Sequence, residues 1–295
     1  MDECVRYVAY DNAARLLAAL RINSSESPIR DASPYQWVFR GHANASWTLL
    51  PTAIRPGTRL GFYDDRPVFV SHGCGAATRH MDGEFRALHQ FAELADRVGL
   101  PVPGLSGLLP FLPFASDEHV VGSQIGTSDW PPRDLLELLA IAQHHGVPTR
   151  LLDFTFSPLA ALFFACGGGD ADKNADGSED LAVWALDLKW TRQQPYEFRV
   201  VEAQRSSNPF LRAQKGVFVL DRRICAWGED SPTPCLEKRV RSDMQLESER
   251  PVLLKFTMPR NESTEALHLL ALENIDYAHL MPSFDNVVKA LRRFT

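Results

Sequence analysis

Apolar residues recur along the chain with two different spacings, which predict helices and strands in turn. Apolar residues at helical spacing cover residues 11–20, 82–98, 131–142, 265–273 and 284–294. Short β-prone runs at residues 37–39, 149–153, 182–186, 217–220 and 252–256 predict strands. This alternation predicts an α/β fold. Ser157-Pro158 opens a further helix that is apolar on nearly every face, and we expect it to be buried at the centre of the molecule.

Two stretches lack a clear period. Residues 57–81 mix glycine, histidine and charged residues, and residues 100–128 are rich in proline, glycine, leucine and phenylalanine. Both are interpreted as insertions, the second as an insertion or a lid. No linker divides the chain, so residues 1–295 are expected to form a single domain.

Composition narrows the class of protein. Of 295 residues, 45% are hydrophobic and 23% are charged, which is typical of a globular chain. A net charge of -6 argues against a broad nucleic-acid-binding surface, although a local basic patch is compatible with it. Five scattered cysteines predict neither disulfides nor a metal site. The acidic start and the short apolar runs predict a cytoplasmic protein without membrane contact.

Four blocks of the sequence carry a family resemblance. They are Phe39-Arg40-Gly41-His42 and residues 143–165, 208–218 and 280–285. The second block, which begins Gln-His-His-Gly-Val-Pro-Thr-Arg-Leu-Leu-Asp, is the longest and most specific. Together they resemble the FRG-domain family from about residue 37 to the C-terminus, with His42 where the family commonly has glutamine.

The order of the motifs also resembles the layout of ADP-ribosyltransferases, which implies a central mixed sheet flanked by helices and NAD as the substrate. In that layout a strand arginine clamps the dinucleotide, a Ser/Thr turn orients the ribose, and a late glutamate stabilises the reacting sugar. The motifs assign these roles to Arg40, to Thr155 with Ser157, and to Gln214. Arginine suits the clamp because its planar fork donates two hydrogen bonds to phosphate oxygens.

The third motif departs from the pattern, because Gln214 stands where a glutamate is expected. Glutamine can bind a ribose hydroxyl but cannot oppose the positive charge of an oxocarbenium ion. We therefore expect another carboxylate to act there, either Asp153 or Glu202. The predicted catalytic set is Arg40, Asp153 and Gln214.

The predicted cofactor-binding set extends over the first two blocks. Besides Arg40, Thr155 and Ser157 it contains Gly41, His42, His144, His145, Thr149 and Arg150. Several of these roles have a structural alternative. Arg40 can pair with Asp153 in the core, and the two histidines can be hydrogen-bonded helix-end residues. Thr149, Arg150 and Asp153 can form a turn held by a salt bridge. The aromatic residues at 154, 156, 163 and 164 are expected to be core.

Two classes of function follow. The first is an NAD-dependent ADP-ribosyltransferase-like enzyme or NAD glycohydrolase, with a toxin or antiphage defence effector as its biological role and an unknown macromolecular acceptor. The second is a non-catalytic module that binds a nucleotide, a nucleic acid or a protein. Both predict a nucleotide-type small molecule as the ligand, and the missing glutamate favours the second.

Overall fold

The computed structural model describes most of the chain. The described residues are 5–55, 58, 76–102, 130–167, 179–194, 196–203, 205, 208–222, 235–243 and 251–291. Most of the two stretches expected to be insertions lies outside the described residues. No helix among the described residues is long and apolar enough to cross a membrane.

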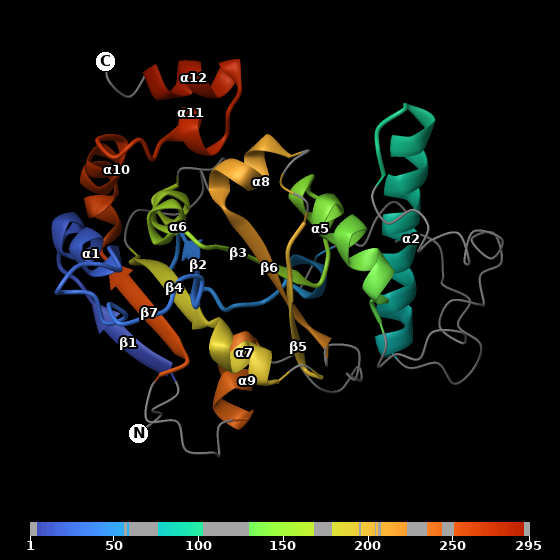
Figure 1. Ribbon diagram of the computed structural model, residues 1–295, viewed down its shortest axis with the longest axis horizontal. Helices are drawn as coiled ribbons and strands as arrows, with labels where there is room; N and C mark the ends of the chain where they lie inside the picture. The colour runs from blue at the N-terminus through green and yellow to red at the C-terminus, as the bar shows by residue number, and fades with distance from the viewer. Residues whose placement is uncertain are drawn as a thin grey trace.

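A seven-stranded mixed sheet forms the centre of the described part (Figure 1). Its strands are β1 (Val5–Ala9), β2 (Trp37–His42), β3 (Leu151–Thr155), β4 (Leu181–Asp187), β5 (Phe198–Val201), β6 (Gly216–Asp221) and β7 (Leu253–Met258). The order across the sheet is β1-β7-β4-β2-β3-β6-β5. Only β1 and β7 pair in parallel among these strands, and the other neighbours are antiparallel. The mixed sheet flanked by helices is therefore confirmed.

Helices cover one face of the sheet in two groups. The first group packs on strands β7, β4 and β2 and consists of α1 (Ala13–Leu20), α6 (Pro158–Ala165) and α10 (Ser263–Ala271). The second group packs on β3, β6 and β5 and consists of α2 (Ala76–Arg97), α5 (Leu136–His144) and α8 (Pro209–Gln214). Each group has its own hydrophobic cluster, so β3 lies at the boundary between two cores. The shorter α11 (Tyr277–Leu280) and α12 (Phe284–Leu291) follow α10.

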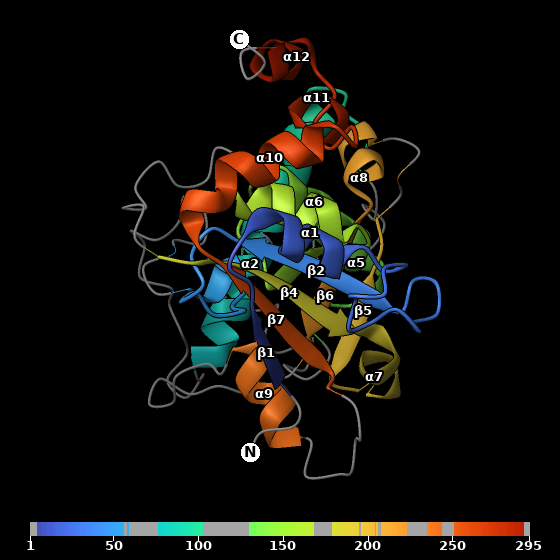
Figure 2. The ribbon, with the colours of Figure 1, turned by 90° about the vertical axis from the view of Figure 1, so that its left-hand side faces the viewer.

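The opposite face has a third hydrophobic cluster. The helices α7 (Leu188–Gln193) and α9 (Leu236–Asp243) lie there, across the strands from α1, α6 and α10 (Figure 2). Leu152 and Phe154 of β3 belong to this cluster. Because successive strand residues point to opposite faces, Asp153 and Thr155 point toward the boundary between the two cores on the first face.

The two halves of the sheet are joined by few backbone contacts. Strand β2 pairs with β4 over six residues, but only Phe39 and Thr155 form a pair between β2 and β3. The two strands diverge beyond that pair. We call this junction between β2 and β3 the seam.

Gly41 permits the closest helix-sheet contact. A Cβ added at Gly41 would lie 2.0 Å from the Ala161 carbonyl oxygen and 2.7 Å from the Ala165 nitrogen. Only glycine therefore allows α6 to lie this near β2. The alanines of α6 present a small surface to the strand, so the Arg-Gly pair and the Ala-rich helix form one packing unit.

Several boundaries differ from the sequence prediction. Strand β2 continues to His42, so Arg40 lies inside it, paired with Trp184, and not at its end. Helix α2 begins at Ala76, not near residue 82. Strands β1 and β5 were not predicted, because their alternation is brief and partly polar. The expected central helix is confirmed as α6, with the Ser157 hydroxyl as its N-cap.

Replacing Gly41 by alanine is expected to lower the free energy of unfolding by about 3 kcal/mol, because the new methyl group displaces the α6 backbone. Gly216→Ala is the matched control. Its Cβ would meet the end of the Leu211 side chain at 2.9 Å, which can move aside, so we expect a loss of about 1 kcal/mol. Urea denaturation measures both, and equal losses would contradict the packing argument.

Candidate functional site

The Arg40 guanidinium closes the seam where backbone pairing stops. Its Nη1 donates to the Asp153 carbonyl oxygen at 2.8 Å and to Asp153 Oδ2 at 3.3 Å. Its Nε donates to His42 Nε2 at 3.0 Å. Within the described part of the chain, no hydrogen bond is made by Nη2. The side chain is 14% exposed, so the guanidinium is largely buried.

The Asp153 carboxylate is held from two sides and remains half exposed. Besides Arg40, Gln143 donates from Nε2 to Asp153 Oδ2 at 2.9 Å. The Gln143 amide is itself fixed, because its Oε1 accepts from the Thr149 hydroxyl at 2.8 Å and from the Thr149 backbone at 3.2 Å. The Asp153 side chain is 48% exposed. The result is an oriented carboxylate that faces solvent, beside a largely buried arginine.

His42 is neutral at physiological pH. Burial, together with the nearby charges of Arg40 and Arg55, lowers its pKa to about 2. Nε2 accepts the hydrogen bond from Arg40, so the single ring proton of the neutral imidazole is on Nδ1. His42 therefore orients the guanidinium without adding charge to the site.

A second group of predicted residues lies at the other end of β3. The Thr155 hydroxyl donates to the Gln214 carbonyl oxygen at 2.6 Å and accepts from the Ser157 backbone at 2.9 Å. The Ser157 hydroxyl accepts from the Ala160 backbone at 3.2 Å. These bonds fix the turn from β3 into α6 against the end of α8.

The register brings both groups onto neighbouring strands. Phe39, Thr155 and Gly216 are aligned across β2, β3 and β6. Arg40 and Gln214 each lie within two residues of this row, and adjacent strands are separated by about 4.8 Å. Arg40 and Gln214 lie on opposite sides of the row, offset by three residues along the strands, so their backbone positions are roughly 14 Å apart. Gln214 is the last residue of α8, just before β6, and is not a strand residue.

The His144 and His145 rings meet edge to face at 5.2 Å, and each also contacts a different helix. His145 stacks on Phe91 of α2 at 6.4 Å, whereas His144 lies 6.0 Å from Phe210 of α8. Burial lowers the pKa of His144, the charge of His145 lowers it further, and the Asp153 carboxylate opposes this by raising it. His144 is therefore the histidine beside Asp153.

Thr149 and Arg150 are buried and take no part in a solvent-facing site. The Arg150 guanidinium pairs with Glu84 of α2 at 2.5 Å, and both side chains are 1% exposed. Glu84 also accepts from the Arg150 backbone at 2.7 Å and from the Trp130 indole at 2.9 Å. The salt bridge expected near Arg150 thus exists, but its partner is Glu84, not Asp153. Gly41, pressed against α6, is likewise structural.

Two adjoining cavities lie next to the turn from β3 into α6. One of about 570 Å³ is lined by Ser157, Phe156 and Lys215 among others, and one of about 470 Å³ shares Phe156 and Lys215 with it. Arg40 and Asp153 line neither. Ser157 is therefore the one predicted site residue among the residues that line these two cavities.

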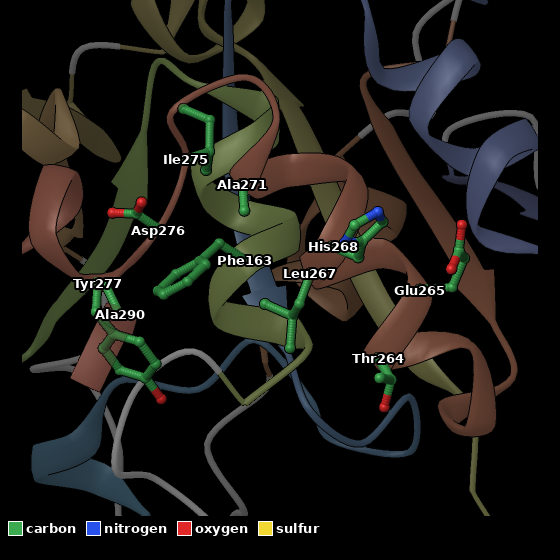
Figure 3. A pocket seen from close by; sticks show the side chains of 10 residues that line it. All are labelled: Phe163, Thr264, Glu265, Leu267, His268, Ala271, Ile275, Asp276, Tyr277 and Ala290. Carbon is green, nitrogen blue, oxygen red and sulfur yellow. The ribbon is translucent and has the colours of Figure 1, made fainter. Parts of the chain in front are cut away.

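A third cavity, of about 390 Å³, lies between α6 and the C-terminal helices. Phe163 of α6 lies between Leu267 of α10 and Tyr277 of α11, with Glu265, His268 and Asp276 at the margin (Figure 3). The Phe163 and Tyr277 rings meet edge to face at 5.2 Å. No predicted site residue lines this cavity, so it is separate from the candidate site.

Sequence reasoning missed three residues that shape the site. Gln143 begins the most specific block but received no role, although its amide orients Asp153. Glu84 carried no signal, because a carboxylate on a helix normally faces solvent. Lys215 lies between Gln214 and Gly216, and only the structure shows its positive φ of 51°. Among the described residues no group of three His, Cys, Asp or Glu side chains is placed to hold a metal ion.

Comparison with known proteins supports the family resemblance. The FRG domain model matches residues 114–174, which include the block that begins at Gln143 and the whole of β3 and α6. The predicted resemblance to the FRG-domain family is confirmed over this segment. No curated protein and no solved structure matches the chain.

Glu84→Gln is expected to destabilise the protein by about 3 kcal/mol, because it leaves the Arg150 charge buried without its carboxylate. Glu93→Gln on the same helix is the control, since its pair with Arg97 is exposed and is expected to contribute less than about 0.5 kcal/mol. Chemical denaturation compares the two. Similar small effects would show that Arg150 does not depend on Glu84.

The depressed pKa of His42 makes stability depend on pH in a defined direction. The unfolded histidine binds a proton below about pH 6.5, whereas folded His42 binds one only near pH 2. The contribution of neutral His42 to the free energy of unfolding is therefore fully present above pH 6.5 and is lost as the pH falls below it. Between pH 6.0 and 5.0 the wild type should lose about 1 kcal/mol more than His42→Gln. Parallel losses in urea titrations at the two pH values would contradict a buried neutral His42.

Proposed function

We propose that the chain binds NAD over the row formed by β2, β3 and β6 and cleaves the bond between nicotinamide and ribose. The ADP-ribosyl group then passes either to a macromolecular acceptor or to water. The observation that supports this most strongly is the register, which aligns the arginine strand, the Ser/Thr turn and the Gln214 segment on three adjacent strands. The motif order in the sequence thus corresponds to neighbours in space.

Arg40 has the properties that a pyrophosphate clamp needs. Its fork is fixed by Asp153 and His42, and Nη2 is left to donate to a phosphate oxygen. A donor that is already oriented loses little entropy when the ligand binds. The neutral state of His42 keeps the positive charge of this region on the guanidinium.

Asp153 supplies the carboxylate that Gln214 lacks. When the C1′–N1 bond breaks, its electron pair leaves with nicotinamide and the ribose acquires oxocarbenium character. A half-exposed carboxylate held by Gln143 and Arg40 can oppose that charge or take the proton of the attacking nucleophile. His144, with its lowered pKa, is the neighbouring base available for the same proton.

A second candidate function is a non-catalytic nucleotide-binding module. It is favoured by the pairing of Arg40 Nη1 with Asp153 and by the uncharged Gln214. In this case the same row binds the nucleotide and no bond is broken. The ligand chemistry is shared, so one experiment can separate the two functions.

The test measures nicotinamide release from NAD by the full chain, alone and with cell lysate as a source of acceptors. Asp153→Asn is expected to reduce release by a factor of about 100 or more, because it removes a charge opposed to the transition state. Arg40→Gln should weaken NAD binding. Asp96→Asn on α2 is the control, an exposed carboxylate outside the row that should retain full activity.

The outcomes separate the proposals. Release that survives in Asp153→Asn but not in Glu202→Gln would overturn the assignment of the carboxylate. Absence of release together with a thermal shift by NAD would leave the binding module, since a ligand at 100 times its Kd stabilises by about 2.7 kcal/mol. Absence of both would contradict both functions.

A further inference from the structure

We infer that the two adjoining cavities beside the turn from β3 into α6 bind single-stranded nucleic acid. Together they form a cleft between residues 21–37 on one side and Phe156 and Lys215 on the other. The cavities have volumes of about 570 and 470 Å³ and share a wall, so they fit two linked nucleotides better than one. The inference does not depend on NAD chemistry.

The charged residues of the cleft are mostly cationic. Arg21, Arg30, Arg205 and Lys215 line it, against the single carboxylate of Glu273, which pairs with Arg21. Lys215 makes no ion pair or side-chain hydrogen bond to any residue that the structure describes. Arg30 pairs with Asp31 and Arg205 with Glu202, so Lys215 is the cation of the cleft that no described carboxylate balances, on a chain whose net charge is -6.

Arg205 lines the same cleft and has one unsatisfied polar atom. Its Nη2 bonds to Glu202 at 2.9 Å and to the Gly216 carbonyl at 3.2 Å. Its Nε is buried and has no hydrogen-bond partner within the described residues. A buried donor without a partner is costly, so the Arg205 side chain is held here at an energetic cost, with its guanidinium at the wall of the cleft.

Aromatic rings alternate with these cations. The Tyr35 ring is 68% exposed and meets Phe156 edge to face at 5.3 Å. The Arg205 guanidinium lies 5.7 Å from the centre of the Phe156 ring. Exposed aromatic faces beside a positive groove are how proteins bind single strands, because every base can stack and the strand carries regular phosphates.

Backbone strain is concentrated on this cleft. Three non-glycine residues in the described part have positive φ, and two of them, Tyr35 at 59° and Lys215 at 51°, line it. Glycine or asparagine would adopt these angles at lower cost, particularly at Lys215, the C-cap of α8. Fold stability alone would favour glycine or asparagine at both positions, yet the chain has an aromatic ring at Tyr35 and a cation at Lys215.

The test uses the full chain and fluorescein-labelled hexathymidylate, with fluorescence anisotropy as the readout. With phosphate contacts from Arg30, Arg205 and Lys215, affinity should fall by roughly 20-fold between 50 and 200 mM salt. Lys215→Gly should weaken binding and reduce the slope of log affinity against log salt concentration by about 0.7. The same change should raise the melting temperature, because glycine relieves the backbone strain. Tyr35→Asn should weaken binding by roughly 5- to 150-fold without loss of stability.

Matched controls lie outside the cleft. Lys189→Gln removes an exposed lysine of α7, and Tyr196→Asn removes a tyrosine that is 86% exposed. Both should bind hexathymidylate as the wild type does. Equal effects in the control and cleft variants would overturn the inference, as would the absence of binding at 50 mM salt.

Free nucleotides separate a strand site from a nucleotide site. AMP and NAD are expected to displace hexathymidylate only at concentrations far above those of an unlabelled strand. Displacement by either at concentrations similar to the unlabelled strand would show that the cleft takes a single nucleotide or the dinucleotide, and would overturn the inference. If the protein binds hexathymidylate but releases no nicotinamide from NAD, only the proposed NAD chemistry is contradicted.

Discussion

The hydrogen bond from the Arg40 guanidinium to the Asp153 main chain is the contact on which the arrangement of this protein depends. Beyond Phe39 and Thr155 the two halves of the sheet lack backbone pairs, and a side chain takes their place. A backbone-only junction would leave no functional group there. The fold thereby sets a largely buried cation against a half-exposed carboxylate at the junction of the two halves of the sheet.

The surrounding contacts hold this junction without neutralising it. Gln143 fixes the Asp153 carboxylate, and His42 accepts from Arg40 while remaining uncharged. Gly41 brings α6 against the same strand, which sets the start of that helix and the Ser157 turn beside the row. Packing and polar chemistry are therefore coupled through two consecutive residues, Arg40 and Gly41.

The parts of the fold that could be predicted are those with strong local signals. The continuous apolar run after Ser157-Pro158 predicted α6, and short β-prone runs predicted β4 and β6, because burial dominates those segments. The buried Glu84 and the partner of Arg150 could not be predicted, since they depend on α2 meeting β3 across 66 residues of chain. The alternative that paired Arg40 with Asp153 is confirmed as a contact, and the ligand roles of both residues stay a prediction.

Hydrogen exchange of the full chain with and without NAD tests the central claim most directly. If the row across β2, β3 and β6 is the ligand site, NAD should slow amide exchange together in residues 37–42, 151–157 and 211–216. These three segments are far apart in sequence, so a shared response reports their meeting in space. Protection confined to residues 264–277, around the separate cavity, or no protection at saturating NAD, would contradict the account.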